Sequence, residues 1–157
     1  IVTLFDVDCI PTDRKVFQTV IDLVDDTTIY GNAQVSNAYP YAAPSFVSFT
    51  RKLYDKSPHK NFEGMYYPDE NGNHKEADCG EVFVKENLRI GNKQILSYPT
   101  SVIEPKWRYA GNERYKAFEY GNGTSFDNKT FHCFQIRLPE AQSIFINYVK
   151  EFLNEKN

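Results

Sequence analysis

Apolar positions recur at helical spacing in two parts of the chain, one near each end. The first stripe follows Pro11 and predicts a helix over residues 13–25. Its apolar members are Val16, Phe17, Val20, Ile21 and Val24. The second stripe follows Pro139, which suits the first turn of a helix, and predicts a helix over residues 139–155. Its members are Ile144, Phe145, Tyr148, Val149, Phe152 and Leu153. We expect this second helix to pack on a sheet through that stripe.

Between the two helices, short runs of β-branched and aromatic residues alternate with turn residues, a pattern typical of strands. The opening run, residues 1–9, predicts a buried strand. Further strands are expected over 27–35, 45–54, 62–67, 81–90, 94–103, 107–111, 114–120 and 131–138. Asn71-Gly72 predicts a hairpin, and turns are also expected at 91–92, 111–112 and 121–123. Pro40 and Pro44 argue against a central strand between residues 36 and 44.

This order of elements predicts an α+β fold. We expect a mostly antiparallel sheet, which could curl towards a barrel, covered by one helix from the N-terminal region and one C-terminal helix. A chain of 157 residues is close to the usual size of one domain. It contains no internal repeat and no linker, so we expect residues 1–157 to form a single globular domain. No apolar run approaches the roughly 20 residues needed to span a bilayer.

Composition narrows the range of partners. The net charge of −3 argues against a general polyanion binder, which usually carries a clearly basic domain. The 15% of aromatic residues favours sheet structure, and the bias towards Phe, Tyr, Asn, Lys and Ile is one that an AT-rich bacterial or viral genome produces. The cysteines, Cys9, Cys79 and Cys133, are odd in number and widely spaced, so we expect free thiols, which slightly favours a cytoplasmic location. Because the sequence opens at Ile1, it does not reveal whether a signal peptide preceded it.

One stretch, KWRYAGNERYKAFEY at residues 106–120, alternates rings with positive charges. In its second strand, two rings and two cations share one face. Such a face could stack the bases of single-stranded nucleic acid, at roughly 1–3 kcal/mol per base, or bind a protein partner. The alternative is an ordinary hairpin with its rings in the core. The predicted binding residues are Trp107 and Tyr109 in the first strand and Arg114, Lys116, Phe118 and Tyr120 in the second.

A second stretch, Asp6-Val7-Asp8, places two carboxylates at the end of the predicted first strand. Carboxylate oxygens are the ligands that hold Mg²⁺ in proteins. The alternative is a solvated acidic strand end that caps the following helix. If Asp6, Asp8 and a further carboxylate converge within about 5 Å on a cleft, an enzyme is favoured, whereas dispersed carboxylates would exclude one.

The residues around this pair also resemble two families of Mg²⁺-dependent enzymes. LFDVDCIPTD resembles the first motif of haloacid-dehalogenase-type phosphatases, in which a strand ends in Asp-x-Asp, although Cys9-Ile10 stands where that family has Gly-Thr. DVDCIP, followed by a helix and by IYGN, also resembles the opening of PIN- or NYN-type nucleases, with Asp78 of KEAD as a later carboxylate. Further acidic motifs of either family do not follow downstream. The resemblances imply Mg²⁺ held by Asp6 and Asp8, and in the nuclease case by Asp78 as well.

The histidines, His59, His74 and His132, lie in no known catalytic motif. His132 is in phase with Phe134 and Ile136, which is typical of a histidine in or beside the core. Taken together, the sequence favours a non-enzymatic binding or accessory domain without a cofactor. That domain would engage a protein partner or single-stranded nucleic acid through an aromatic and polar sheet surface. The alternative function is an Mg²⁺-dependent nuclease or phosphatase centred on Asp6 and Asp8.

Overall fold

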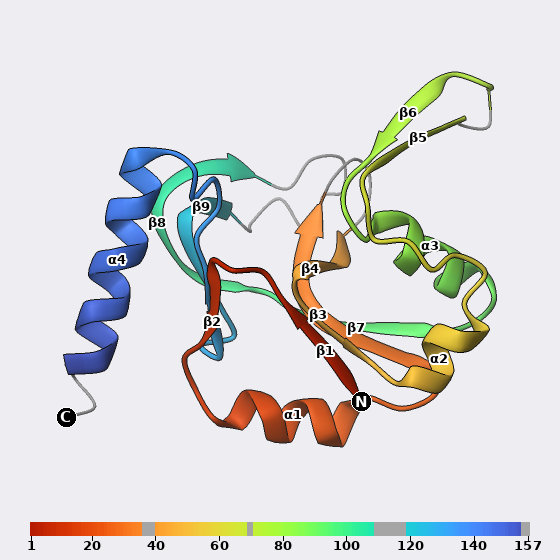
Figure 1. Cartoon of the computed structure of the whole chain (residues 1–157), viewed down its shortest axis with the longest axis horizontal. Helices are drawn as coiled ribbons and strands as arrows, with labels where there is room; N and C mark the ends of the chain where they lie inside the picture. Colours follow the sequence, from red (N-terminus) through yellow and green to blue (C-terminus); the bar gives the residue numbers. More distant parts are fainter. Residues whose placement is uncertain (36–39, 69–70, 109–118, 155–157) are drawn as a thin grey trace.

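The computed structural model describes residues 1–35, 40–68, 71–108 and 119–154 (Figure 1). Its helices are α1 (Lys15–Leu23), α2 (Arg51–Lys56), α3 (Glu81–Arg89) and α4 (Pro139–Asn154). Its first five strands are β1 (Val2–Phe5), β2 (Cys9–Pro11), β3 (Thr28–Val35), β4 (Pro40–Phe49) and β5 (Met65–Pro68). The remaining strands are β6 (His74–Ala77), β7 (Lys93–Ser97), β8 (Pro99–Arg108), β9 (Glu119–Phe126) and β10 (Thr130–His132).

The strands form two four-stranded sheets and one hairpin. One sheet has the order β1-β4-β3-β7, the other has the order β2-β10-β9-β8, and β5 pairs with β6 as the hairpin expected around Asn71-Gly72. The β3–β7 pair is parallel, and the other described pairs are antiparallel. The predicted α+β class with mostly antiparallel strands is therefore confirmed, while neither sheet closes into a barrel through the strands that the structure describes. Within the described ranges, no helix is both long and apolar enough to cross a membrane.

Helices cover both faces of the first sheet (Figure 1). On one face, α1 buries Val16 and Val20 against Tyr30 and Phe46. On the opposite face, α2 and α3 contribute Leu53, Phe83 and Val84 to a larger core. The alternation of side chains along β3 and β4 supplies apolar residues to both faces, and this explains why most of β4 is buried.

The second sheet is covered by α4 (Figure 1). The ring of Tyr148 stacks on Phe131 of β10, with ring centroids 3.6 Å apart, and Ile144 and Phe145 pack beside them. This contact confirms the predicted packing for Ile144, Phe145 and Tyr148, whereas Leu153 of the predicted stripe is exposed. A third cluster containing Ala33 and Tyr120 fills the space between the two sheets.

The structure corrects several predicted elements. The strand expected over 1–9 ends at Phe5 and resumes as β2, because an unbroken strand would have carried Asp6 and Asp8 on the same face as the packed side chain of Leu4. Residues 81–90 form helix α3 rather than a strand, and the end of the strand expected over 45–54 forms helix α2. In α3, buried residues recur at helical spacing, and the Glu81 carboxylate accepts a hydrogen bond from the backbone N–H of Asp78 at 3.0 Å, which closes its first turn.

The turn expected at 121–123 is instead part of β9. Both glycines of this Gly-Asn-Gly sequence allow close packing and do not form a turn. A Cβ atom at Gly121 would lie 2.2 Å from the carbonyl oxygen of Ile103, and one at Gly123 would lie 2.6 Å from the Phe131 ring. The turn expected at 111–112 lies outside the described residues.

Strand β4 also contradicts the expectation that Pro40 and Pro44 exclude a central strand. Among the described residues, strand β1 pairs with residues 46–49 of β4, so both prolines lie where that edge of β4 has no described strand partner. Pairing with β3 shifts register between Gly31 and Ala33, which leaves residues 43–46 as a bulge. Gly31 is required there, because a Cβ atom would lie 2.5 Å from the carbonyl oxygen of Phe46.

Candidate metal centre

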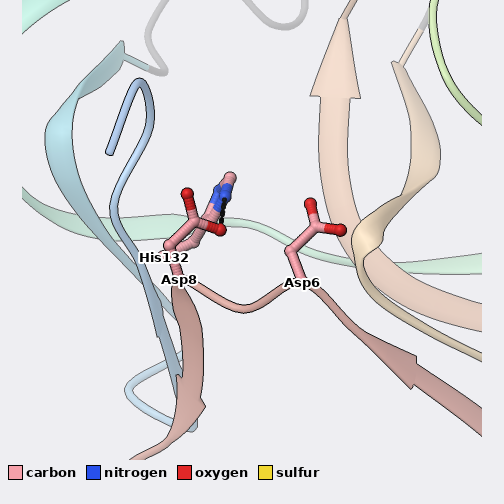
Figure 2. A group of neighbouring side chains, drawn as sticks. All are labelled: Asp6, Asp8 and His132. Atoms are coloured by element: carbon pink, nitrogen blue, oxygen red, sulfur yellow. Dashed lines mark ion pairs between the residues drawn. The ribbon is translucent and has the colours of Figure 1, made fainter. Parts of the chain in front are cut away.

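The Asp6–Asp8 segment is the place where the chain crosses from the first sheet to the second (Figure 2). The N–H of Asp6 continues the β1–β4 pairing by donating to the carbonyl of Ser45 at 3.2 Å. The carbonyl of Asp8 continues the β2–β10 pairing by accepting from the N–H of Cys133 at 3.0 Å. A further bond, from the N–H of Cys9 to the carbonyl of Asp6 at 3.0 Å, closes the turn. Each aspartate is thus fixed to a different sheet.

This crossing brings Asp6 and Asp8 together with His132 of β10, as Figure 2 shows. One potential ligand atom from each side chain lies within 4.8 Å of the other two. His132 is only 6% exposed and Asp8 only 9%, whereas Asp6 is exposed. Nε2 of His132 lies 3.2 Å from Oδ1 of Asp8. The register of β10 against β2, with His132 opposite Cys9, fixes the imidazole beside the Asp8 carboxylate.

The second nitrogen of His132 has no hydrogen-bond partner among the described residues. Nδ1 is buried, and the ring packs edge-on against Phe134 with centroids 4.1 Å apart. A buried polar atom without a partner costs about 1–3 kcal/mol, so such an atom calls for an explanation. A ligand could provide one, whereas an ion held by Nε2 beside Asp8 would leave Nδ1 without a partner.

A pocket of about 230 Å³ opens beside these side chains. Its lining comes from the first sheet, the second sheet and the segment that leads into α3. The lining residues are Asp6, Gln34, Tyr41, Ala43, Pro44, Ser45, Asp78, Cys79, His132 and Phe134. The bulge in β4 supplies the middle of this wall, including Ser45, and the turn before α3 supplies Asp78.

Three groups in or next to the pocket, Asp6, Cys9 and Tyr41, have raised pKa values. The pKa of Asp6 is raised, first by partial removal from water and then by the nearby charges of Asp8 and Asp78, although His132 opposes the shift. Burial raises the pKa of the Cys9 thiol, and both aspartates of the crossing add to that effect. Burial followed by the Asp78 charge raises the pKa of Tyr41. The carboxylates of Asp6, Asp8 and Asp78 therefore lie close together at the pocket, and a bound cation would offset their repulsion.

The three side chains fit a divalent metal ion in chemistry, and small side-chain movements would bring them to ligand spacing. Ligand atoms that each lie about 2.1 Å from one tetrahedral ion are about 3.4 Å apart. Side chains at the observed limit of 4.8 Å would therefore have to close by up to about 1.4 Å. Two carboxylates and one imidazole form a donor set that suits Zn²⁺ or Mn²⁺ better than Mg²⁺, which prefers oxygen ligands.

The structure brings only part of the predicted metal set to one place. Asp78 lines the same pocket as Asp6 but does not belong to the group whose ligand atoms lie within 4.8 Å of one another. Its carboxylate instead accepts hydrogen bonds from Nε2 of Gln34 at 3.3 Å and from the N–H of Cys79 at 2.8 Å. The third member of the cluster is a histidine, His132, and not the further carboxylate that the sequence criterion for an enzyme required. The sequence pattern indicated His132 as a packed histidine. It is packed, and it also faces a carboxylate.

The predicted aromatic binding residues lie for the most part outside the described residues. This is the case for Tyr109, Arg114, Lys116 and Phe118. Trp107 lies in β8, paired with Tyr120 of β9. The ring of Tyr120 is 6% exposed, and its hydroxyl donates a hydrogen bond to the carbonyl of Ala33, so a base cannot stack on it in this structure. A binding surface on the rest of this stretch stays a prediction.

Comparison with known proteins gave no match to any family model, curated protein or solved structure. The two family resemblances therefore rest only on the residues quoted for them, which are the Asp6–Asp8 stretch and, for the nucleases, also IYGN and Asp78. In this structure, that stretch links two strands of different sheets, and neither strand is parallel to its neighbour.

Proposed function

We propose that this protein binds one divalent transition-metal ion through Asp6, Asp8 and His132 and acts as a metal-dependent hydrolase. The observation that carries the proposal is the convergence of these three side chains, from two sheets, at the edge of a pocket. The proposal retains the aspartate pair of the nuclease or phosphatase hypothesis and replaces Mg²⁺ with Zn²⁺ or Mn²⁺, because an imidazole joins the carboxylates.

The arrangement suits hydrolysis for two reasons. Three protein ligands leave at least one coordination position for water, and a Zn²⁺ ion lowers the pKa of bound water from 15.7 to about 7. That open position would face the pocket, which Asp6 and His132 line. A substrate in the pocket would therefore lie next to the activated water.

Buried neighbours support the same site. Cys9 and Cys133 flank it, yet burial raises the pKa of both thiols, that of Cys133 to about 11. These thiols are therefore protonated near pH 7 and do not compete with the carboxylates as thiolate ligands. The favoured donors are the two carboxylates and the imidazole.

The experiment is a metal add-back assay on protein first treated with EDTA. Hydrolysis of p-nitrophenyl phosphate, bis-p-nitrophenyl phosphate and alanine p-nitroanilide is followed with Mg²⁺, Mn²⁺ or Zn²⁺. We expect Mn²⁺ or Zn²⁺ to restore turnover of at least one substrate, and Asp6→Asn to abolish it. Glu151→Gln, which removes one exposed carboxylate on α4, is the matched control and should keep full activity.

Turnover that is equal with and without metal, or that survives in Asp6→Asn, would contradict the proposal. Metal binding without hydrolysis of any of the three substrates would keep the metal site but remove the hydrolase assignment.

A further inference from the structure

Among the polar groups that line the pocket and that the metal site does not use are Ser45, from the bulge of β4, and Asp78, from the turn before α3. The side chain of Ser45 is 3% exposed, and its hydroxyl has no hydrogen-bond partner among the described residues. Ser45 is bonded through its backbone to Asp6 on the adjacent strand, so its side chain lies beside the metal ligands. A buried hydroxyl at a pocket wall without a partner indicates a group that a bound molecule satisfies.

Asp78 is held in a fixed orientation at the same pocket. Gln34 and the N–H of Cys79 both donate to its carboxylate, at 3.3 and 2.8 Å. A carboxylate has about four acceptor sites, so capacity for another donor remains. Its charge is also felt by Asp6 and Tyr41, which places it within electrostatic reach of the metal ligands.

The charges of the pocket distinguish between substrate classes. One divalent ion neutralises Asp6 and Asp8, which leaves the negative charge of Asp78. Among the described residues that line the pocket, none is a lysine or an arginine. A phosphate group would therefore meet a like charge without a cationic side chain to bind it, whereas a protonated amine would meet a fixed carboxylate.

We propose that the pocket binds a substrate with a protonated amino group next to the carbonyl that is hydrolysed, such as an amino-acid amide or the first residue of a peptide. This inference rests on the proposed metal-dependent hydrolase. Asp78 accepts hydrogen bonds from the ammonium group, the Ser45 hydroxyl donates to the substrate carbonyl, and the metal site supplies the water. The pocket, at about 230 Å³, is smaller than the roughly 300–1,000 Å³ of typical ligand sites, so it fits one small end group of a substrate.

The bond change is a simple hydrolysis. The oxygen of the metal-bound water forms a bond to the carbonyl carbon, and the carbon–nitrogen bond of the amide breaks. One proton of the water passes to the departing nitrogen, so that a carboxylic acid and an amine leave without any oxidant or further reactant.

The test measures the binding of two probes that differ in the charge of one nitrogen. Titration calorimetry compares alaninamide, which carries an ammonium group, with N-acetylalaninamide, which does not, on Zn²⁺-loaded protein. Inorganic phosphate is the third probe. We expect alaninamide to bind at least about 10-fold more tightly than the other two, since one charge-assisted hydrogen bond accounts for that ratio. Asp78→Asn should remove the preference; because the lost charge also acts on the metal ligand Asp6, the probes are compared at saturating Zn²⁺ in each variant.

Ser45→Ala serves as a second variant, because it removes only a hydroxyl that has no described partner and should leave the fold intact. It should weaken both amide probes, and Glu151→Gln should weaken neither. Tighter binding of phosphate, an equal preference in Asp78→Asn, or no binding of alaninamide would overturn the inference. Because Zn²⁺ binding is measured separately, these outcomes differ from a failure of the metal site itself.

Discussion

Asp6→Asn is expected to stabilise the metal-free protein. The carboxylate of Asp6 accepts no hydrogen bond from the described residues, and its pKa is raised by partial removal from water and by the charges of Asp8 and Asp78. A raised pKa means that the folded state favours the neutral form, so the ionised form lowers the free energy of unfolding near pH 7. Asparagine imitates the neutral form.

The size of the effect is limited because Asp6 is exposed and water screens its charge. We expect a gain in unfolding free energy of at most about 1 kcal/mol, which corresponds to a rise in Tm of about 2–4 °C for a chain of this length. The direction of the Asp6 pKa shift also fixes how the stability gain of Asp6→Asn depends on pH. The advantage of the variant is complete above the raised pKa of Asp6, decreases as the pH falls through that value, and disappears below the unfolded value of about 3.9.

The assay is thermal unfolding followed by circular dichroism with EDTA present, from pH 7 to pH 3.5. Glu151→Gln is the control and should change the unfolding free energy by less than about 0.5 kcal/mol. Without metal, Asp6→Asn should be more stable than the wild type. Zn²⁺ at 100 times its dissociation constant should make the wild type the more stable of the two, because it stabilises the wild-type protein by about 2.7 kcal/mol but should not stabilise Asp6→Asn. A loss of more than about 1 kcal/mol in the metal-free variant at pH 7 would refute the reasoning, since it would mean that the carboxylate stabilises the fold.

Three further predictions concern the fold. Thiol titration of the native protein should find one fast-reacting group, Cys79, because Cys9 and Cys133 are buried. Titration of the denatured protein without reductant should find three thiols, because all three cysteines are free, and a total of one would reveal a disulfide. A chain that ends at Leu138 should lose cooperative thermal unfolding, because α4 covers the Phe131 side of the second sheet; a melt near the intact temperature would contradict this packing. Gly123→Ala should lower the free energy of unfolding by about 1–3 kcal/mol, because the added methyl group meets the Phe131 ring, and an unchanged denaturation midpoint would argue against that contact.

The elements that could be predicted from the sequence are those with a strong local signal. The stripe around Tyr148 and the Asn71-Gly72 hairpin depend on residues close together in the chain, and both are present in the structure. The strand predicted over 81–90 is wrong because Val82, Phe83 and Val84 suit a buried strand as well as a helix, and only the hydrogen bond between Asp78 and Glu81 starts the helix.

The candidate site was only half predictable. The Asp6–Asp8 pair is a local pattern, but His132 joins it from more than a hundred positions later, through the pairing of β10 with β2. Ser45 reaches the pocket because of a bulge in β4, and periodicity cannot indicate a bulge of this kind. The one sequence signal for His132 was a histidine in an apolar strand, which packing alone also explains.

The central claim is that Asp6, Asp8 and His132 hold one metal ion, and isothermal titration of Mn²⁺ and Zn²⁺ into EDTA-treated protein tests it most directly. Each variant is first compared with the wild type by circular dichroism, so that loss of binding can be separated from loss of fold. We predict that one ion binds per wild-type chain, and that Asp6→Asn and His132→Gln each weaken the affinity at least about 10-fold, as loss of a ligand should. Glu151→Gln should bind like the wild type. Equal affinity in the wild type and in Asp6→Asn, or no binding to the wild type at millimolar metal, would contradict the claim.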